Sequence, residues 1–250
     1  MTIIVTQKHM KLQKPIALAC CAIVALSGSG LSGKAAETRS GNSRRTFADW
    51  CRQKADLSPE AKRTVEMLLK EAGTTECDAA NQKLSSLTQL VFDKNQISDI
   101  KPLESLTNLT WLDLDNNQIS DIKPLQSLTN LTDLYLRNNQ VSDIKPLESL
   151  TNLTWLVLYN NQISDIKPLQ FLTNLTVLGI EKNQISDIKP LQSLTNLTHL
   201  GLGDNQISDI KPLQSLTNLT LVGLGGNPIA PKTCPLKSES ICNWEPLPKP

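Results

Sequence analysis

The chain has 250 residues, of which 39% are hydrophobic and 20% charged, and this balance excludes both wholesale disorder and a multi-span membrane protein. The formal net charge is +1, but the first 36 residues hold four lysines and no acid. The rest of the chain therefore has 21 basic and 24 acidic side chains, a net charge of −3. This excludes a basic nucleic-acid-binding protein, because phosphate binding needs concentrated positive charge.

Residues 1–36 are predicted to be an export signal. Lys8, Lys11 and Lys14 form a positive region ahead of the apolar run 16–26, and small residues follow that run. The run is about half as long as a transmembrane helix needs to be, so the pattern favours a cleaved secretory signal. We therefore expect a mature chain without a transmembrane helix that is secreted or held in the periplasm or cell envelope.

Several details of this signal stay open at the level of sequence. Cleavage after Ala35, with Gly33 at the −3 position, satisfies the small-residue requirement, and cleavage after Ser27 is the alternative. Either Met1 or Met10 can be the true start. An uncleaved N-terminal anchor and a lipid anchor are the alternatives. The lipid anchor would use one of two cysteines that lie inside the apolar run instead of after it.

Residues 37–83 are predicted to form an N-terminal helical cap. The segment Thr46–Asp49 resembles a capping box and favours a helix start there. Ser58-Pro59 predicts the start of a second helix, and Gly73 predicts its end. The apolar stripe of this second helix consists of Ala61, Val65, Leu68, Leu69 and Ala72.

Residues 84–229 contain seven copies of a 22-residue repeat, L-T-x-L-x-L-x-x-N-x-I-S-D-I-K-P-L-x-S-L-T-N. Its first half, L-x-x-L-x-L-x-x-N, is the signature of a leucine-rich repeat. One column is asparagine in every copy: Asn95, Asn117, Asn139, Asn161, Asn183, Asn205 and Asn227. Stacked copies are predicted to form an asparagine ladder, because an amide can satisfy backbone donors and acceptors left unpaired at a turn.

One copy is enough to predict the fold of all seven. Leu112 and Leu114 alternate with polar or aromatic residues, which is typical of a short strand with one buried face. Pro124 excludes a central strand and favours a 3₁₀ or irregular return segment. We therefore predict an α/β fold: a leucine-rich-repeat solenoid, or horseshoe, of seven parallel strands on the concave side and 3₁₀ or irregular segments on the convex side.

Residues 230–250 are predicted to form a C-terminal cap and a proline-rich tail. Beyond residue 36 the chain has four cysteines, an even number that favours disulfides in an exported protein. Cys51 with Cys77 and Cys234 with Cys242 is the favoured connectivity, because no cysteine lies between the two pairs. A zinc site is the alternative, but only His199 remains to assist and no C-x-x-C spacing exists, so we expect no metal.

The repeat resembles a known class of proteins. Residues 117–125 read Asn-Gln-Ile-Ser-Asp-Ile-Lys-Pro-Leu and residues 127–131 read Ser-Leu-Thr-Asn-Leu, which is similar to the 22-residue repeat of bacterial internalins and of the SDS22-like group. The similarity covers residues 84–229. It implies a horseshoe scaffold that binds other macromolecules without catalysis.

The outward positions of the strands differ between copies, whereas the return segments barely change. Aromatic side chains with a few charges on a rigid sheet are typical of an interaction surface. The predicted partner-binding residues are Trp111, Asp113, Asp115, Asp133, Tyr135, Arg137, Trp155, Tyr159, Glu181 and His199. Two alternatives stay open: these positions have drifted without a ligand, and Arg137 merely pairs with Asp115 on the neighbouring strand.

Two other repeated patterns are interpreted as scaffold. Six N-L-T sequences match the glycosylation acceptor pattern, but their leucine is a core position. The lysine of each repeat follows an aspartate by two residues, which indicates a solvated face that balances its own charge.

The sequence thus predicts an exported, non-catalytic module that binds a protein partner through its concave face. No set of nucleophile, base and orienting residue can be assembled when His199 is the one histidine beyond residue 36, so we expect neither an enzyme nor a cofactor. A cell-envelope carbohydrate-binding protein and a structural envelope component without a specific ligand are the alternatives.

Overall fold

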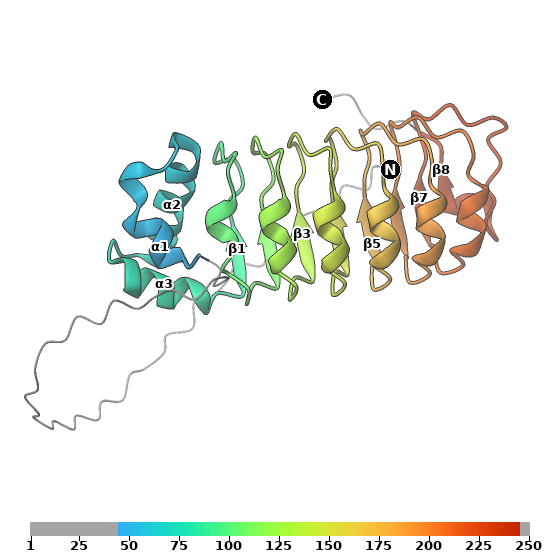
Figure 1. The fold of residues 1–250 in the computed structure, drawn as a ribbon. Coiled ribbons are helices and arrows are strands. Elements are labelled where there is room, and N and C mark those ends of the chain that lie inside the picture. The colour runs from blue at the N-terminus through green and yellow to red at the C-terminus, as the bar shows by residue number, and fades with distance from the viewer. Residues whose placement is uncertain (1–44, 246–250) are drawn as a thin grey trace, which may run out of the picture. The chain divides into compact units, whose positions relative to one another are not determined.

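The computed structural model describes residues 45–245, which form three α-helices at one end of an eight-stranded sheet (Figure 1). The predicted signal, residues 1–36, lies outside the described residues. The helices are α1 (Phe47–Arg52), α2 (Pro59–Ala72) and α3 (Cys77–Ser85). The strands are β1 (Gln89–Val91), β2 (Trp111–Asp113), β3 (Asp133–Tyr135), β4 (Trp155–Val157), β5 (Val177–Gly179), β6 (His199–Gly201), β7 (Leu221–Gly223) and β8 (Cys242–Asn243). Between residues 45 and 245 every helix is too short or too polar to cross a bilayer.

Each of the first six repeats is one strand followed by one 3₁₀ return, as the alternation of leucines and the Lys-Pro step predict. The strands pair in parallel and in sequence order, with equivalent residues 22 positions apart in register from β1 to β7. The 3₁₀ helices lie on the other side of the repeats (Figure 1). They are η2 (Lys101–Leu103), η3 (Lys123–Ser127), η4 (Lys145–Ser149), η5 (Lys167–Phe171), η6 (Lys189–Ser193) and η7 (Lys211–Ser215). The inward leucines and isoleucines of both sides form a buried core, which confirms the predicted solenoid.

The conserved asparagine column bonds neighbouring repeats through their backbones. Oδ1 of Asn139 accepts a hydrogen bond from the N–H of Ile119, 3.0 Å away in the preceding repeat. Its Nδ2 donates to the carbonyls of Leu114 and Leu136, at 3.0 and 3.2 Å. The predicted asparagine ladder therefore forms. Its hydrogen bonds join asparagine side chains to backbone groups. Each buried amide satisfies polar groups of two consecutive coils, which fixes how one repeat stacks on the next.

Direct bonds between asparagine side chains occur one position earlier in the repeat. Asn138 Nδ2 donates to Asn116 Oδ1 at 2.7 Å, and Asn160 Nδ2 donates to Asn138 Oδ1 at 2.8 Å. All three residues have φ between 52° and 57°, in the left-handed region that asparagine tolerates better than most residues. The equivalent Lys94 and Lys182 adopt the same conformation, so the backbone geometry of this turn holds even where the residue is not asparagine.

The N-terminal cap covers the first repeat. Thr46 and Asp49 form the predicted capping box of α1, and α2 begins after the N-cap Ser58 and ends at Gly73, which has φ 63°. The predicted apolar stripe of α2 is buried. Thr64 Oγ1 donates to the carbonyl of Asp99 at 2.6 Å, so α2 also bonds directly to the first return segment. The open end of the sheet is thereby shielded.

The ends of the chain differ from the sequence prediction in two ways. Helix α3 was not predicted, because its sequence buries only Ala80 and Leu84 and has no continuous apolar stripe. The expectation of seven strands was wrong: β8 pairs in parallel with β7 and makes an eighth. Disulfides join Cys51 to Cys77 and Cys234 to Cys242, the pairs that the cysteine spacing favours.

Candidate functional site

The outward side chains of the strands form three rows, which together we call the strand face. Row A follows the first residue of each strand: Gln89, Trp111, Asp133, Trp155, Val177, His199 and Leu221. Row B follows the third: Val91, Asp113, Tyr135, Val157, Gly179, Gly201 and Gly223. Row C lies two residues further on, where the strands end: Asp93, Asp115, Arg137, Tyr159, Glu181, Gly203 and Gly225. All ten predicted partner-binding residues lie in these rows, so the structure brings them to one face.

The ten outward residues are not equally exposed. Asp113, Asp115 and Glu181 are buried, with exposed fractions of 4%, 3% and 7%. His199 is exposed, and the other six are half-buried. The reason is that side chains of neighbouring strands lie against one another, so that a polar residue on a sheet face can still be covered by the residues of the adjacent rows.

The two tryptophans of row A flank one carboxylate. Asp133 is in register with Trp111 on one side and Trp155 on the other, which places the tryptophans about two strand spacings, roughly 10 Å, apart. Tyr135 packs edge-on against Trp111, with ring centroids 6.0 Å apart and an interplanar angle of 68°. Among residues 45–245, neither indole Nε1 atom has a hydrogen-bond acceptor, and both atoms are buried. This part of the face therefore combines aromatic surface with unused hydrogen-bond donors.

Asp115 and Arg137 form an ion pair across neighbouring strands in row C. Arg137 Nε lies 2.8 Å from Asp115 Oδ2, and the backbone N–H of Arg137 donates to Asp115 Oδ1 at 2.6 Å. The alternative that Arg137 pairs with Asp115 is thus correct for this residue. Burial nevertheless raises the pKa of Asp115 to about 6, since desolvation outweighs the attraction of the guanidinium. Burial also raises the pKa of Asp113.

The tyrosines of the face lie next to cations. The Arg137 guanidinium lies 5.8 Å from the ring centroid of Tyr135, and the Lys182 ammonium lies 5.3 Å from that of Tyr159. Burial, and secondarily the charge of Asp133, raises the pKa of Tyr135 to about 12. The Tyr135 phenol therefore stays a neutral hydrogen-bond donor at physiological pH.

The strand face changes character between β4 and β7. Rows B and C contain no glycine up to β4, whereas five positions beyond it are glycine: Gly179, Gly201, Gly203, Gly223 and Gly225. We call these five residues the glycine strip. The Glu181 side chain lies over the strip, because a Cβ atom added to Gly201 would collide with its carboxylate and one added to Gly179 would lie 3.1 Å from Oε2.

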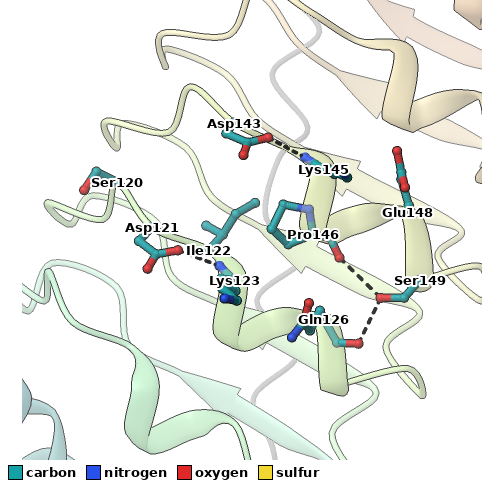
Figure 2. Close-up of a pocket in the computed structure, with 10 residues that line it drawn as sticks. All are labelled: Ser120, Asp121, Ile122, Lys123, Gln126, Asp143, Lys145, Pro146, Glu148 and Ser149. Carbon is teal, nitrogen blue, oxygen red and sulfur yellow. Dashed lines mark hydrogen bonds between the residues drawn. The ribbon is translucent and has the colours of Figure 1, made fainter.

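A second concave region lies on the return side, between η3 and η4 (Figure 2). It is a shallow groove with a volume of about 790 Å³, and Figure 2 shows that its charged side chains come from two consecutive repeats. Asp121 Oδ1 accepts from the N–H of Lys123 at 2.9 Å, and Asp143 Oδ1 does the same for Lys145. The aspartates therefore close the turns that begin each 3₁₀ helix. Because this arrangement recurs in every repeat from η2 to η7, we assign it to the scaffold.

The asparagines of the N-L-T sequences, which match the glycosylation acceptor pattern, also have a scaffold role. In five consecutive copies their Nδ2 atoms donate, each at 2.9 Å, to a threonine carbonyl of the preceding repeat. Within residues 45–245, no group of three or more His, Cys, Asp or Glu side chains is placed to hold a metal ion.

Comparison with known proteins agrees with this architecture. The family model described as leucine-rich repeats in two copies matches residues 107–149, 151–193 and 195–238. No curated protein matches the chain. Among solved structures, internalin C2 of Listeria monocytogenes is 33% identical, with a TM-score of 0.62 over 72% of this chain and 90% of the internalin chain.

Two further structures are similar over shorter parts of their length. The internalin InlF of Listeria monocytogenes is 33% identical, with a TM-score of 0.56 over 70% of this chain and 58% of its own. A leucine-rich-repeat protein of Leptospira interrogans is 30% identical, with a TM-score of 0.52 over 61% of this chain and 46% of its own. The chain therefore belongs to the leucine-rich-repeat family and is an internalin-like member of it.

Proposed function

We propose that the protein is an exported, non-catalytic module whose strand face binds another protein. The observation that carries this proposal is the contrast between the two sides of the same repeats. The return segments repeat one set of internal bonds, whereas the strand face places Trp111, Asp133 and Trp155 side by side in otherwise equivalent positions. Aromatic side chains beside a carboxylate form the anchors of many protein interfaces.

The strand face is also the side on which unused bonding capacity is concentrated. The indole Nε1 atoms of Trp111 and Trp155, and Nη2 of Arg137, have no hydrogen-bond acceptor within residues 45–245. Unpaired buried donors cost stability in a free protein, so a partner that moves these side chains on binding would gain hydrogen bonds from them. Two further unpaired atoms, Trp50 Nε1 and Ser105 Oγ, lie outside the strand face.

Export is supported by the positions of the disulfides. One closes the N-terminal cap and the other closes the segment beyond the last repeat, and such cross-links persist in oxidising compartments. Membership of the internalin-like family favours a protein as the ligand. The binding site that we propose for this chain is its strand face.

The test is capture of partners by the mature, oxidised protein, followed by measurement of the affinity with the purified partner. Replacing Trp111 and Trp155 together with alanine is expected to weaken that affinity by about a hundredfold or more, because anchor residues contribute about 2 kcal/mol or more each. The matched control replaces Gln126 and Gln170, which are exposed on the return side, with alanine. Equal affinity for both double variants would refute the proposal.

A cell-envelope glycan is the second candidate, favoured by the two indoles that flank Asp133, since aromatic faces beside a carboxylate also suit sugar rings. A glycan array probed with the wild-type protein and the double tryptophan variant distinguishes the two. Retention of wild type alone would favour the glycan, and no retention would exclude it. A structural component without a ligand predicts no specific partner in either assay.

A further inference from the structure

Row C contains two buried acids, Asp115 and Glu181, in different surroundings. Asp115 has a neighbouring cation in the row, whereas Glu181 does not. Asp115 has a cation on the next strand, because the Arg137 side chain occupies the neighbouring position of the row. Glu181 has Gly203 at the equivalent neighbouring position. The chain thus supplies a cation for one buried carboxylate and leaves an empty position beside the other.

The Glu181 carboxylate has no partner from another residue. It accepts a hydrogen bond from its own backbone N–H, and within residues 45–245 it forms no ion pair. Its exposed fraction is 7%, and burial, opposed in part by the distant charge of Arg137, raises its pKa. A carboxylate in such a place is strongly stabilised by any cation that reaches it.

The charged groups around Glu181 do not fill this role. Lys182 directs its ammonium over the Tyr159 ring, 5.3 Å from the centroid. Asp204 adds a second negative charge, and its side chain lies over Gly226, next to the glycine strip. Arg137 is engaged by Asp115. The local field is therefore negative. The side-chain atoms that lie nearest to Gly179 and Gly201 belong to Glu181 and Val157, and neither residue is a cation.

We propose that the Glu181 carboxylate and the glycine strip form a socket for an arginine side chain of the protein partner. The inference rests on the proposed function, and it specifies the chemistry of the partner. The guanidinium would reproduce across the interface the pair that Arg137 and Asp115 form within the chain. Arginine fits better than lysine, because a planar group can lie flat on glycine backbone and stack on a neighbouring tyrosine while it binds both carboxylate oxygens.

The charge of the whole strand face is complementary to such a partner. Rows A to C contain one arginine against five acids: Asp93, Asp113, Asp115, Asp133 and Glu181. Attraction between this face and a basic segment would speed association and orient it, and it would weaken as salt is added. The glycine strip then determines where on the face the arginine binds.

The test uses the peptides Gly-Arg-Gly-Arg-Gly and Gly-Lys-Gly-Lys-Gly as probes and records backbone amide signals of the full mature protein by NMR. The arginine peptide is expected to bind saturably and to shift the amide signals of Gly201, Gly203 and Gly223. Glu181→Gln is expected to weaken this binding by about tenfold or more, as the loss of a charge-assisted bond predicts. The matched control Glu148→Gln makes the same substitution on the return side, in η4, and it is expected to change the affinity by less than about threefold.

A variant that adds a side chain to the strip provides the complementary test. Gly203→Arg places an arginine of the chain itself beside Glu181, at a row position that accommodates arginine and tyrosine in other repeats. Gly203 does not have a positive φ, so the substitution does not strain the backbone. This variant is expected to keep the fold and to lose binding of the arginine peptide. If it fails to fold, the comparison of Glu181→Gln with Glu148→Gln decides the question.

Three results would overturn the socket: no saturable shift in the glycine strip, equal effects of Glu181→Gln and Glu148→Gln, or equal binding of the lysine peptide. These results are distinct from failure of the proposed function. If the double tryptophan variant loses the protein partner while the arginine peptide does not bind at the glycine strip, the proposed binding face is supported and the socket is refuted. If the double tryptophan variant keeps the partner, the binding face itself is wrong.

Discussion

The Oδ1 atom of Asn117 accepts hydrogen bonds from two backbone amides of the preceding repeat, those of Ile97 at 2.9 Å and Asn95 at 3.2 Å. The same amide donates through Nδ2 to carbonyls of both repeats. One buried side chain thus joins consecutive coils, and its equivalents do so along the chain. The stability of the solenoid should accordingly depend more on this column than on any surface feature.

Replacing one member of the column tests this dependence. Asn161→Ala removes the acceptor of the Val141 N–H and the donor to the Leu136 and Leu158 carbonyls, all of them buried. We expect a loss of about 3 kcal/mol or more in the free energy of unfolding, because each unsatisfied buried group costs roughly 1–3 kcal/mol. The control Asn152→Ala removes one exposed bond, to the Thr129 carbonyl, and should cost less than about 1 kcal/mol. Urea unfolding measures both, and equal losses would contradict the role of the column.

The exposed Phe171 is a local exception in the return segments. Serine at the equivalent position bonds through Oγ to a carbonyl of the preceding repeat, as Ser149 does with Gln126 at 2.9 Å and Ser193 with Gln170 at 2.8 Å. Phe171 lacks this donor, and its exposed fraction is 49%. Phe171→Ser should therefore raise the free energy of unfolding by about 0.5–1 kcal/mol. A decrease would mean that the phenyl ring packs favourably on the return side.

The disulfide between Cys51 and Cys77 should stabilise the cap. It closes a segment with a sequence separation of 26, for which loss of chain entropy in the unfolded state corresponds to about 3 kcal/mol. Replacing both cysteines with alanine is expected to lower the Tm, measured by calorimetry under oxidising conditions. The reduced wild type also loses the disulfide between Cys234 and Cys242, so its Tm should be at or below that of the variant. Detection of free thiols at Cys51 in the unreduced protein would contradict the pairing.

The raised pKa of Asp115 predicts a pH dependence of stability with a definite sign. The folded chain, with a pKa of about 6, binds this proton more tightly than the unfolded chain, whose value is near 3.8. Stability contributed by this group is therefore present below about pH 4 and is lost as the pH rises through 6, by at most about 3 kcal/mol. Asp113 and Glu181 act in the same direction.

The measurement is the free energy of unfolding of wild type and Asp115→Asn across that range. The difference, wild type minus variant, should fall between pH 4 and pH 7, because the variant has no proton to lose at this position. A difference that rises instead would mean that the Arg137 ion pair outweighs the cost of burying the carboxylate.

Much of the fold could be predicted because the 22-residue repeat determines which residues of neighbouring strands are paired. The inward leucines predict a strand with one buried face, the asparagine column predicts the turn after it, and the proline predicts the return segment. The copies repeat these features. Helix α3 and strand β8 were missed because neither carries that pattern. Two residues such as Cys242 and Asn243 form a strand only because β7 offers an open edge, which is a non-local cause.

The candidate site was predicted in outline for the same reason. The spacing of 22 residues placed Trp111, Asp133 and Trp155 in one row without any coordinates. Burial of Glu181 was not predicted, since it depends on where a flexible side chain turns relative to Gly201. The sequence did hold a signal, because row alignment puts an acid next to consecutive glycines.

Solvent footprinting of the strand face in a complex tests the central claim most directly. Oxidative labelling of Trp111, Trp155 and Phe171 can be compared by mass spectrometry in the free protein and in the complex with the purified partner. A protein held by the strand face predicts strong protection of both tryptophans and unchanged labelling of Phe171 on the return side. Protection of Phe171 with unchanged labelling of the tryptophans would place the partner on the opposite side and contradict the account.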